Sequence, residues 1–167
     1  ELNSVDALLT TELLFANAFR DRSPADIVAL LSCQVFQEKS DIEDIPEHLE
    51  AAVDDMICTA ERLESLQKDL RVPIFGDASN STRPPALRLG LCNVVYLWAR
   101  GHPFTSIITT TDVLEGSIVR CIVRLDETCR EVRNAARIMG DLELASKMEQ
   151  ASVAIKRDIC FASSLYL

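Results

Sequence analysis

The 167-residue chain has the length of one domain, and a domain of that size buries roughly 70% of the surface that its unfolded chain exposes. Its 48% hydrophobic and 26% charged residues, with only five glycines and six prolines, indicate a folded helical protein and exclude a disordered or all-β chain. The net charge of −9 argues against a free-standing nucleic-acid binder, because phosphate contacts supply much of the affinity of such proteins.

The charge is unevenly distributed along the chain. Residues 1–82 contain 6 Lys and Arg against 17 Asp and Glu, whereas residues 83–167 contain 11 against 9. We therefore expect any polyanion to contact the second half. The acidic first half is expected to be a solvated surface or a face for a basic partner.

The six cysteines are scattered among apolar residues, without a CxxC pair or a neighbouring histidine. This spacing favours reduced, mostly buried thiols of an intracellular protein over a zinc site or a disulfide framework. No apolar run approaches the roughly 20 residues that a membrane-spanning helix needs, so no membrane contact is predicted.

The first half of the chain is predicted to form three helices. Dense apolar residues over 5–19 predict a buried helix. Ser23 and the proline after it predict an N-terminal cap and a second helix from 24 to about 36. Pro46 is expected to open a third helix, whose apolar stripe continues to Leu70.

Residues 71–85 are rich in turn-forming residues and are predicted to form a flexible loop. Neither half of the chain has enough helices to close a core of its own. The chain is therefore predicted to be a single all-α bundle over residues 1–167.

The second half is predicted to contain a helix over 86–100 that ends at Gly101, and a short turn of helix over 103–108. A long helix then runs to Met139, and a last helix extends from 142 to about 163. Gly140 and Asp141 are expected to end the long helix and to cap the last one.

The turn before the long helix carries two predictions. Asp112 with Glu115 three residues later predicts an N-cap box. The short and long helices also have the outline of a helix-turn-helix. Acids occupy the first turn of its second helix and would repel phosphate, so two packed helices around a tight turn are favoured over a DNA reader.

The long helix has an apolar stripe and a polar stripe. The apolar stripe, with spacings of three and four, is expected to face the core and contains Ile118, Ile122, Leu125, Cys129, Val132, Ala136 and Met139. One position earlier runs a polar row that contains Ser117, Arg120, Arg124, Glu127, Glu131 and Asn134. Such a row is most often only a solvated face, but guanidinium groups can stack on bases or bind phosphate.

Motifs of enzyme chemistry are missing from the sequence. It contains no GxxxxGK[ST], GxGxxG, GxSxG or HExxH pattern, and His48 and His102 lie in unrelated contexts. The pairs Asp54-Asp55 and Asp126-Glu127 are expected to be solvated acids, because adjacent residues on a helix point about 100° apart. No catalytic, metal-binding or cofactor-binding residue is predicted in this chain.

Five blocks of the sequence together indicate a protein family: ALLSCQVFQEKSD at 29–41, NVVYLWARG at 93–101, TDVLEGSIVR at 111–120, RLDETCREVRNAARIMGD at 124–141 and IKRDICFASSLYL at 155–167. They closely resemble the C-terminal helical (DSHCT) domain of the DExH-box RNA helicases that feed the RNA exosome. Several blocks resemble the cytoplasmic superkiller type more than the nuclear TRAMP-complex type. The resemblance therefore implies a cytoplasmic protein, or a nuclear one if the second type applies.

The resemblance implies a bundle of about six to seven helices, packed against RecA-like and winged-helix domains outside this fragment. It implies an ATP-dependent 3′-to-5′ RNA helicase that guides single-stranded RNA for exosome-mediated decay, with ATP and magnesium bound by the RecA-like domains. The long helix resembles the family's ratchet helix, and the RxxE pair of that helix matches Arg124 and Glu127 as RNA contacts. Arg120 is added from the polar row alone. Superkiller-complex or exosome components are the expected partners, and a protein-docking platform without an RNA role is the alternative.

Overall fold

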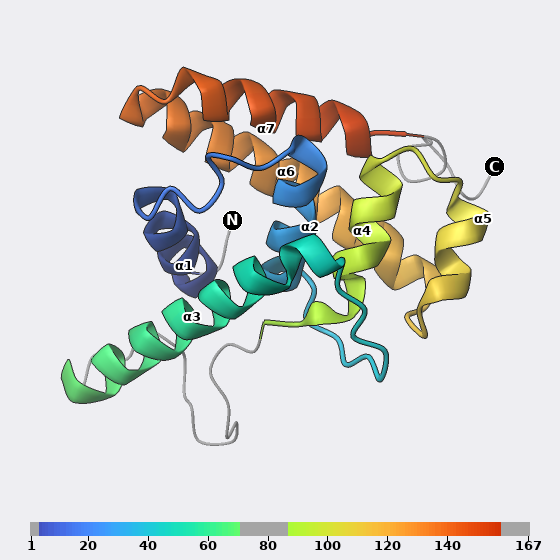
Figure 1. Ribbon diagram of the computed structural model, residues 1–167, viewed down its shortest axis with the longest axis horizontal. Helices are drawn as coiled ribbons and strands as arrows, with labels where there is room; N and C mark the ends of the chain where they lie inside the picture. The colour runs from blue at the N-terminus through green and yellow to red at the C-terminus, as the bar shows by residue number, and fades with distance from the viewer. Residues whose placement is uncertain (1–3, 71–86, 158–167) are drawn as a thin grey trace.

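The computed structural model describes residues 4–70 and 87–157, and this part of the chain contains no strand (Figure 1). The predicted all-α class is confirmed. The α-helices are α1 Ser4–Phe15, α2 Pro24–Val35, α3 Glu50–Leu70, α4 Cys92–Ala99, α5 Phe104–Ile107, α6 Glu115–Met139 and α7 Leu142–Ile155. Short 3-10 helices cover Glu47–Leu49, Leu89–Leu91 and Ile108–Thr110.

The helices pack around α2, which contacts α4, α6 and α7 (Figure 1). Every residue of α2 from Ile27 onward is buried, so this helix forms the centre of a single hydrophobic core. The α6 and α7 helices run side by side as an antiparallel pair (Figure 1). The α1 helix packs on α3, which extends away from the rest of the bundle.

The predicted start of α2 is confirmed in detail. The Ser23 hydroxyl accepts a hydrogen bond from the Asp26 backbone N–H at 3.2 Å, and the Ser23 N–H donates to the Asp26 carboxylate at 3.0 Å. This reciprocal pair satisfies backbone groups that an uncapped helix end leaves unpaired.

Other helix boundaries differ from the predictions. The first helix ends at Phe15, not at 19, because Asn17 adopts a left-handed φ of 55° and turns the chain. Pro46 precedes a 3-10 turn, so α3 begins at Glu50. The fourth helix begins at Cys92, and α7 is helical to Ile155. The predicted continuation of the last helix to about 163 is wrong, because the helix ends at Ile155 and Lys156 is its C-cap. The predicted loop at 71–85 lies outside the described residues.

The expected cap of α6 by Asp112 is wrong. The N-cap position is Leu114, which makes no side-chain capping bond. The Asp112 carboxylate instead accepts hydrogen bonds from the Ser40 hydroxyl at 2.5 Å and from the Asp41 backbone N–H at 2.8 Å. Asp112 therefore ties the loop after α2 to the turn before α6.

The end of α6 is as predicted. Gly140 adopts a left-handed φ of 81°, and Asp141 caps α7 by accepting a hydrogen bond from the Leu144 N–H at 2.9 Å. Gly101 also has a positive φ, 96°, after the end of α4. Glycine adopts this conformation at little steric cost, so both positions end helices as expected.

The segment after α7 is fixed to α4. The indole N–H of the buried Trp98 donates to the Ile155 carbonyl at 2.9 Å. The Arg157 guanidinium lies 4.0 Å from the centre of the Trp98 ring and donates to the Trp98 carbonyl at 2.7 Å. A cation–π contact and two hydrogen bonds thus join the far end of α7 to the end of α4.

Candidate nucleic-acid interface

The orientation of α6 is set by its apolar stripe, which contacts α2 and α7. Six of the seven predicted stripe residues are buried: Ile118, Ile122, Leu125, Cys129, Val132 and Ala136. Met139 is the exception, with 47% of its surface exposed, because it is the last residue of the helix. With the stripe buried, the neighbouring polar row is directed away from the core.

The polar row is exposed over most of its length. Arg120, Arg124, Glu127, Glu131 and Asn134 are all exposed. Ser117 differs from the prediction, because it is only 4% exposed. Its hydroxyl donates to the Glu38 carboxylate at 2.8 Å, so the residue is covered by the loop after α2.

Arg120 takes part in the same contact with this loop. Its Nη2 atom lies 3.2 Å from Oε1 of Glu38 and donates to the Ser117 hydroxyl at 2.8 Å. The side chains of Arg120 and Glu38 are 71% and 52% exposed, so water screens this ion pair strongly. Arg120 is therefore held in place by a weak contact that a stronger anion could replace.

A pocket of about 240 Å³ lies at this end of the row. Its lining comes from the end of α2, the loop that follows and α6: Val35, Phe36, Gln37, Glu38, Ser117, Arg120, Cys121 and Arg124. Both predicted arginines thus border one pocket. Glu38 was missed as part of it, because its approach to α6 depends on a contact between residues 79 apart in the sequence.

Arg124 and Glu127 lie one turn apart on the exposed face. Within residues 4–70 and 87–157, neither the Arg124 guanidinium nor the Glu127 carboxylate has a hydrogen bond or an ion pair. A guanidinium in this state can stack on a ring or bind an anion, and the carboxylate can accept hydrogen bonds. Both side chains are therefore available to contact a ligand.

Asp126, next to Glu127, is not the solvated acid that was expected. It is 2% exposed, and its carboxylate accepts hydrogen bonds from the Ser152 hydroxyl at 2.5 Å and from Arg130. Lys156 Nζ lies 3.0 Å away. Burial opposes the charged form, but the bonds from Ser152 and Lys156 and the two nearby cations outweigh it, so the pKa of Asp126 is lowered.

The burial of Asp126 had a signal in the sequence. The residue lies four positions after Ile122 and three before Cys129, which places it beside the apolar stripe. Its partner Arg130 follows at i+4 on the same helix. Because its other partners come from α7 and the segment after it, Asp126 fixes α6 to α7 directly behind the exposed pair.

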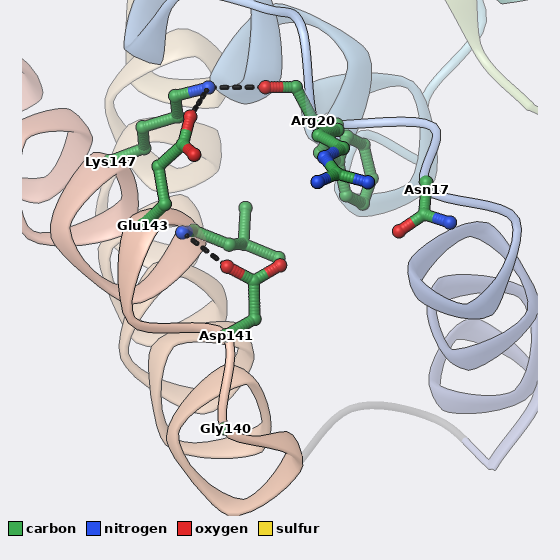
Figure 2. A pocket seen from close by; sticks show the side chains of 8 residues that line it. Asn17, Arg20, Gly140, Asp141, Glu143 and Lys147 are labelled. Atoms are coloured by element: carbon green, nitrogen blue, oxygen red, sulfur yellow. Dashed lines mark hydrogen bonds and ion pairs between the residues drawn. The ribbon is translucent and has the colours of Figure 1, made fainter.

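A second pocket, of about 300 Å³, lies where the α6–α7 turn meets the segment after α1 (Figure 2). Lys147 extends from α7 and donates to the Arg20 carbonyl, while its Nζ atom lies 2.9 Å from the Glu143 carboxylate. The Asp141 carboxylate is occupied as the α7 cap (Figure 2). These contacts hold the turn in place, and we assign this pocket a structural role.

The two histidines singled out in the sequence contact other segments of the chain. Nε2 of His48 lies 2.8 Å from the Asp26 carboxylate, and the His102 carbonyl accepts a hydrogen bond from Arg157. In the described ranges, no group of three or more His, Cys, Asp or Glu side chains is arranged to hold a metal ion. The helices of these ranges also include none with the length and apolar character needed to cross a membrane.

Comparison with known proteins gives a family match over residues 1–162, to the DSHCT (NUC185) domain. The chain is 46% identical over its whole length to the Arabidopsis thaliana DExH-box ATP-dependent RNA helicase DExH11. It is 40% identical over its whole length to the human Exosome RNA helicase MTR4 and 41% identical over 95% of its length to the human Superkiller complex protein 2. The chain spans only 12%, 16% and 12% of these three relatives, respectively.

Proposed function

The chain belongs to the DSHCT domain family, and from that membership we propose that it is the C-terminal helical domain of an ATP-dependent 3′-to-5′ RNA helicase. In this proposal the RecA-like domains outside the chain bind ATP and magnesium and move the RNA. The helical domain forms one wall of the path of the single-stranded RNA. The domain thereby guides RNA toward decay by the exosome.

Arg124 and Glu127 are exposed and have no ion pair within the described ranges, and this observation supports an RNA contact. Within the described ranges, Arg120 is tied to Glu38 and Asp126 to α7, whereas the side chains of Arg124 and Glu127 make no ion pair. The Arg124 guanidinium would stack on a base, and the Glu127 carboxylate would accept from a base amino group or a ribose hydroxyl. Such contacts hold RNA without reading its sequence.

The rigid support of α6 favours a ratchet-type role for this helix. Its buried stripe packs on α2 and α7, and the ion cluster of Asp126 lies directly behind the exposed pair. A side chain on a helix fixed in this way keeps its position while the RNA moves. We therefore assign Arg124 and Glu127 as successive base contacts and Arg120 as a secondary contact, for which phosphate would compete with Glu38.

The experiment is a double substitution, Arg124→Ala with Glu127→Ala, in the full-length parent protein. We expect ATP hydrolysis to continue while unwinding of an RNA duplex with a 3′ single-stranded extension slows about tenfold, the effect of losing roughly one stacked base. Arg137→Ala is the matched control, because it removes an exposed guanidinium of α6 that points about 140° away from Arg124. Unwinding at the unmodified rate in the double variant would contradict the assignment.

The acidic surface of α3 supports a second candidate function, the docking of a basic partner. Its exposed carboxylates include Glu50, Asp54, Asp55 and Glu61, and the helix extends away from the bundle (Figure 1). The partner would be a component of a superkiller or exosome complex, or another domain of the parent protein. Charge reversal by Asp54→Lys with Glu61→Lys should then prevent complex assembly and leave RNA unwinding intact, whereas intact assembly would argue against docking.

The cellular location is part of the proposal. We infer a cytoplasmic location together with the superkiller type. The chain is 41% identical to the human Superkiller complex protein 2 and 40% identical to the human Exosome RNA helicase MTR4, so the identities support the two types about equally. Microscopy of the tagged full-length protein in its own cells tests this directly, and a nuclear signal would favour the other type.

A further inference from the structure

The glycines of the described ranges occupy positions with different structural requirements. A Cβ atom at Gly90 would come within 2.4 Å of the Ser40 Cβ, so that position has no room for a side chain. Gly101 and Gly140 have φ angles of 96° and 81°, which side chains rarely allow. The fold therefore explains these three glycines.

Gly116 has room for a side chain and does not have a positive φ angle. It is the second residue of α6, and a Cβ atom there would meet no atom within 4 Å apart from its chain neighbours and the backbone of its own helix. Glycine loses more conformational freedom than alanine when it enters a helix, so the fold itself favours a side chain at this position. The fold therefore does not explain why position 116 is a glycine.

Gly116 shares the exposed face of α6 with the proposed RNA contacts. Arg120, Glu127 and Asn134 follow it at 4, 11 and 18 residues, and these spacings return to the same side of a helix. The distance from Gly116 to Glu127 along the helix axis is roughly 16 Å. Gly116, Arg120 and Glu127 therefore lie on one continuous face of α6.

We propose that Gly116 leaves clearance for the RNA strand, so that a nucleotide next to the one at Arg124 passes against the backbone of α6. This inference rests on the proposed RNA function of the face. Glycine is the residue that permits close approach of a backbone to a ligand. RNA is the proposed occupant because Arg120 and Arg124 place two guanidinium groups on this face, and guanidinium groups bind phosphate and stack on bases.

The test adds a side chain of increasing size at this position in the full-length parent protein. Gly116→Ala and Gly116→Leu are compared with Ala51→Leu, which enlarges the exposed second residue of another long helix, α3. Three quantities are measured: the melting temperature, the affinity for a labelled single-stranded RNA, and the unwinding rate of an RNA duplex with a 3′ extension.

We expect Gly116→Ala to keep or raise the melting temperature, since alanine favours the helix. Gly116→Leu should weaken single-strand affinity and slow unwinding about tenfold, equivalent to losing roughly one stacked base, with Gly116→Ala intermediate. Ala51→Leu should change neither the single-strand affinity nor the unwinding rate. A variant that is more stable but slower separates an RNA contact from a folding defect.

Unmodified unwinding by Gly116→Leu would overturn the inference. Slower unwinding with unchanged single-strand affinity would also overturn it, because another protein domain would then be the neighbour of Gly116. If Gly116→Leu is unaffected while Arg124→Ala with Glu127→Ala slows unwinding, the RNA path on α6 stands and only the clearance role fails. If all of these variants unwind normally, both proposals fail.

Discussion

The Nζ atom of Lys156 lies 3.0 Å from the carboxylate of Asp126, so the segment that follows α7 is bound to the middle of α6. The same carboxylate accepts hydrogen bonds from Ser152 and Arg130. A buried carboxylate with three partners is stable as a charge only while those partners remain in place. The junction of α6 and α7 therefore depends on one acidic side chain.

We expect Asp126→Ala to lower the free energy of unfolding by about 2 kcal/mol, because it removes the acceptor shared by three donors. The loss is moderate because Arg130 and Lys156 are partly exposed and remain solvated without their partner. Urea unfolding followed by circular dichroism measures the change. Glu127→Ala, on the adjacent exposed position, is the control and should change stability by less than about 0.5 kcal/mol. Equal effects of the two substitutions would contradict the buried cluster.

Stability should fall in acid, because Asp126 and Asp26 both have lowered pKa values. Burial opposes the charge of Asp26, but hydrogen bonds from His48 and Ser23 outweigh it. The unfolded chain binds protons at the ordinary pKa of 3.8, and the folded chain binds them only at lower pH. The stabilisation is therefore complete above that value and is lost as the pH falls through the lowered pKa values.

Urea midpoints measured between about pH 6 and pH 2 test this dependence. The variant Asp126→Asn should lose less stability over that interval than the unmodified chain, because one carboxylate with a lowered pKa is gone. A midpoint that stays constant down to the lowest pH would show that neither carboxylate is stabilised in the folded state.

Gly90→Ala should destabilise the chain by about 2 kcal/mol, the usual cost of a group forced into occupied space. The added Cβ atom would lie 2.4 Å from the Ser40 Cβ and 2.7 Å from its hydroxyl oxygen. Ser40→Gly removes both atoms, so Gly90→Ala combined with Ser40→Gly should cost less than the sum of the two single changes. Thermal unfolding of the four proteins forms the double-mutant cycle, and additive effects would exclude the predicted clash.

The thiols should differ sharply in reactivity. Cys58 is exposed, whereas Cys33, Cys92, Cys121 and Cys129 are buried. Burial raises the pKa of both Cys121 and Cys129 to about 12, so neither forms appreciable thiolate near neutral pH.

In a Cys160→Ser background, we expect an alkylating reagent to modify the native chain at Cys58 alone within the first minutes. Peptide mass spectrometry identifies the site, and unfolding in urea should expose the other thiols to the reagent. Early modification of Cys121 would mean that the α2–α6 contact opens readily.

Local sequence patterns predicted the fold well wherever the determining interactions are local. The cap at Ser23, the ends at Gly101 and Gly140, and the buried stripe of α6 all follow from residues within a few positions of one another. The end of α1 was misplaced, because a dense apolar segment does not reveal the left-handed conformation of Asn17.

The candidate site was predicted only in part, because half of its surroundings come from distant segments. The exposure of Arg120, Arg124 and Glu127 follows from the helical period. The pairing of Arg120 with Glu38 and of Asp112 with Ser40 joins residues that are 82 and 72 positions apart. No local rule assigns such partners, so Asp112 looked like a helix cap and Glu38 like an ordinary loop acid.

The two-residue connection at Gly140 and Asp141 also has a consequence for the order of folding. It joins α6 and α7, whose contact is the most extensive between helices of the described ranges, so this hairpin closes with little loss of chain entropy. The hydrogen bond from Trp98 to Ile155 spans 57 residues and must wait for a larger loop to close. After dilution from denaturant, helix formation should therefore precede the fluorescence change of the single tryptophan, and the kinetic lag reports the docking of α4 onto a preformed hairpin.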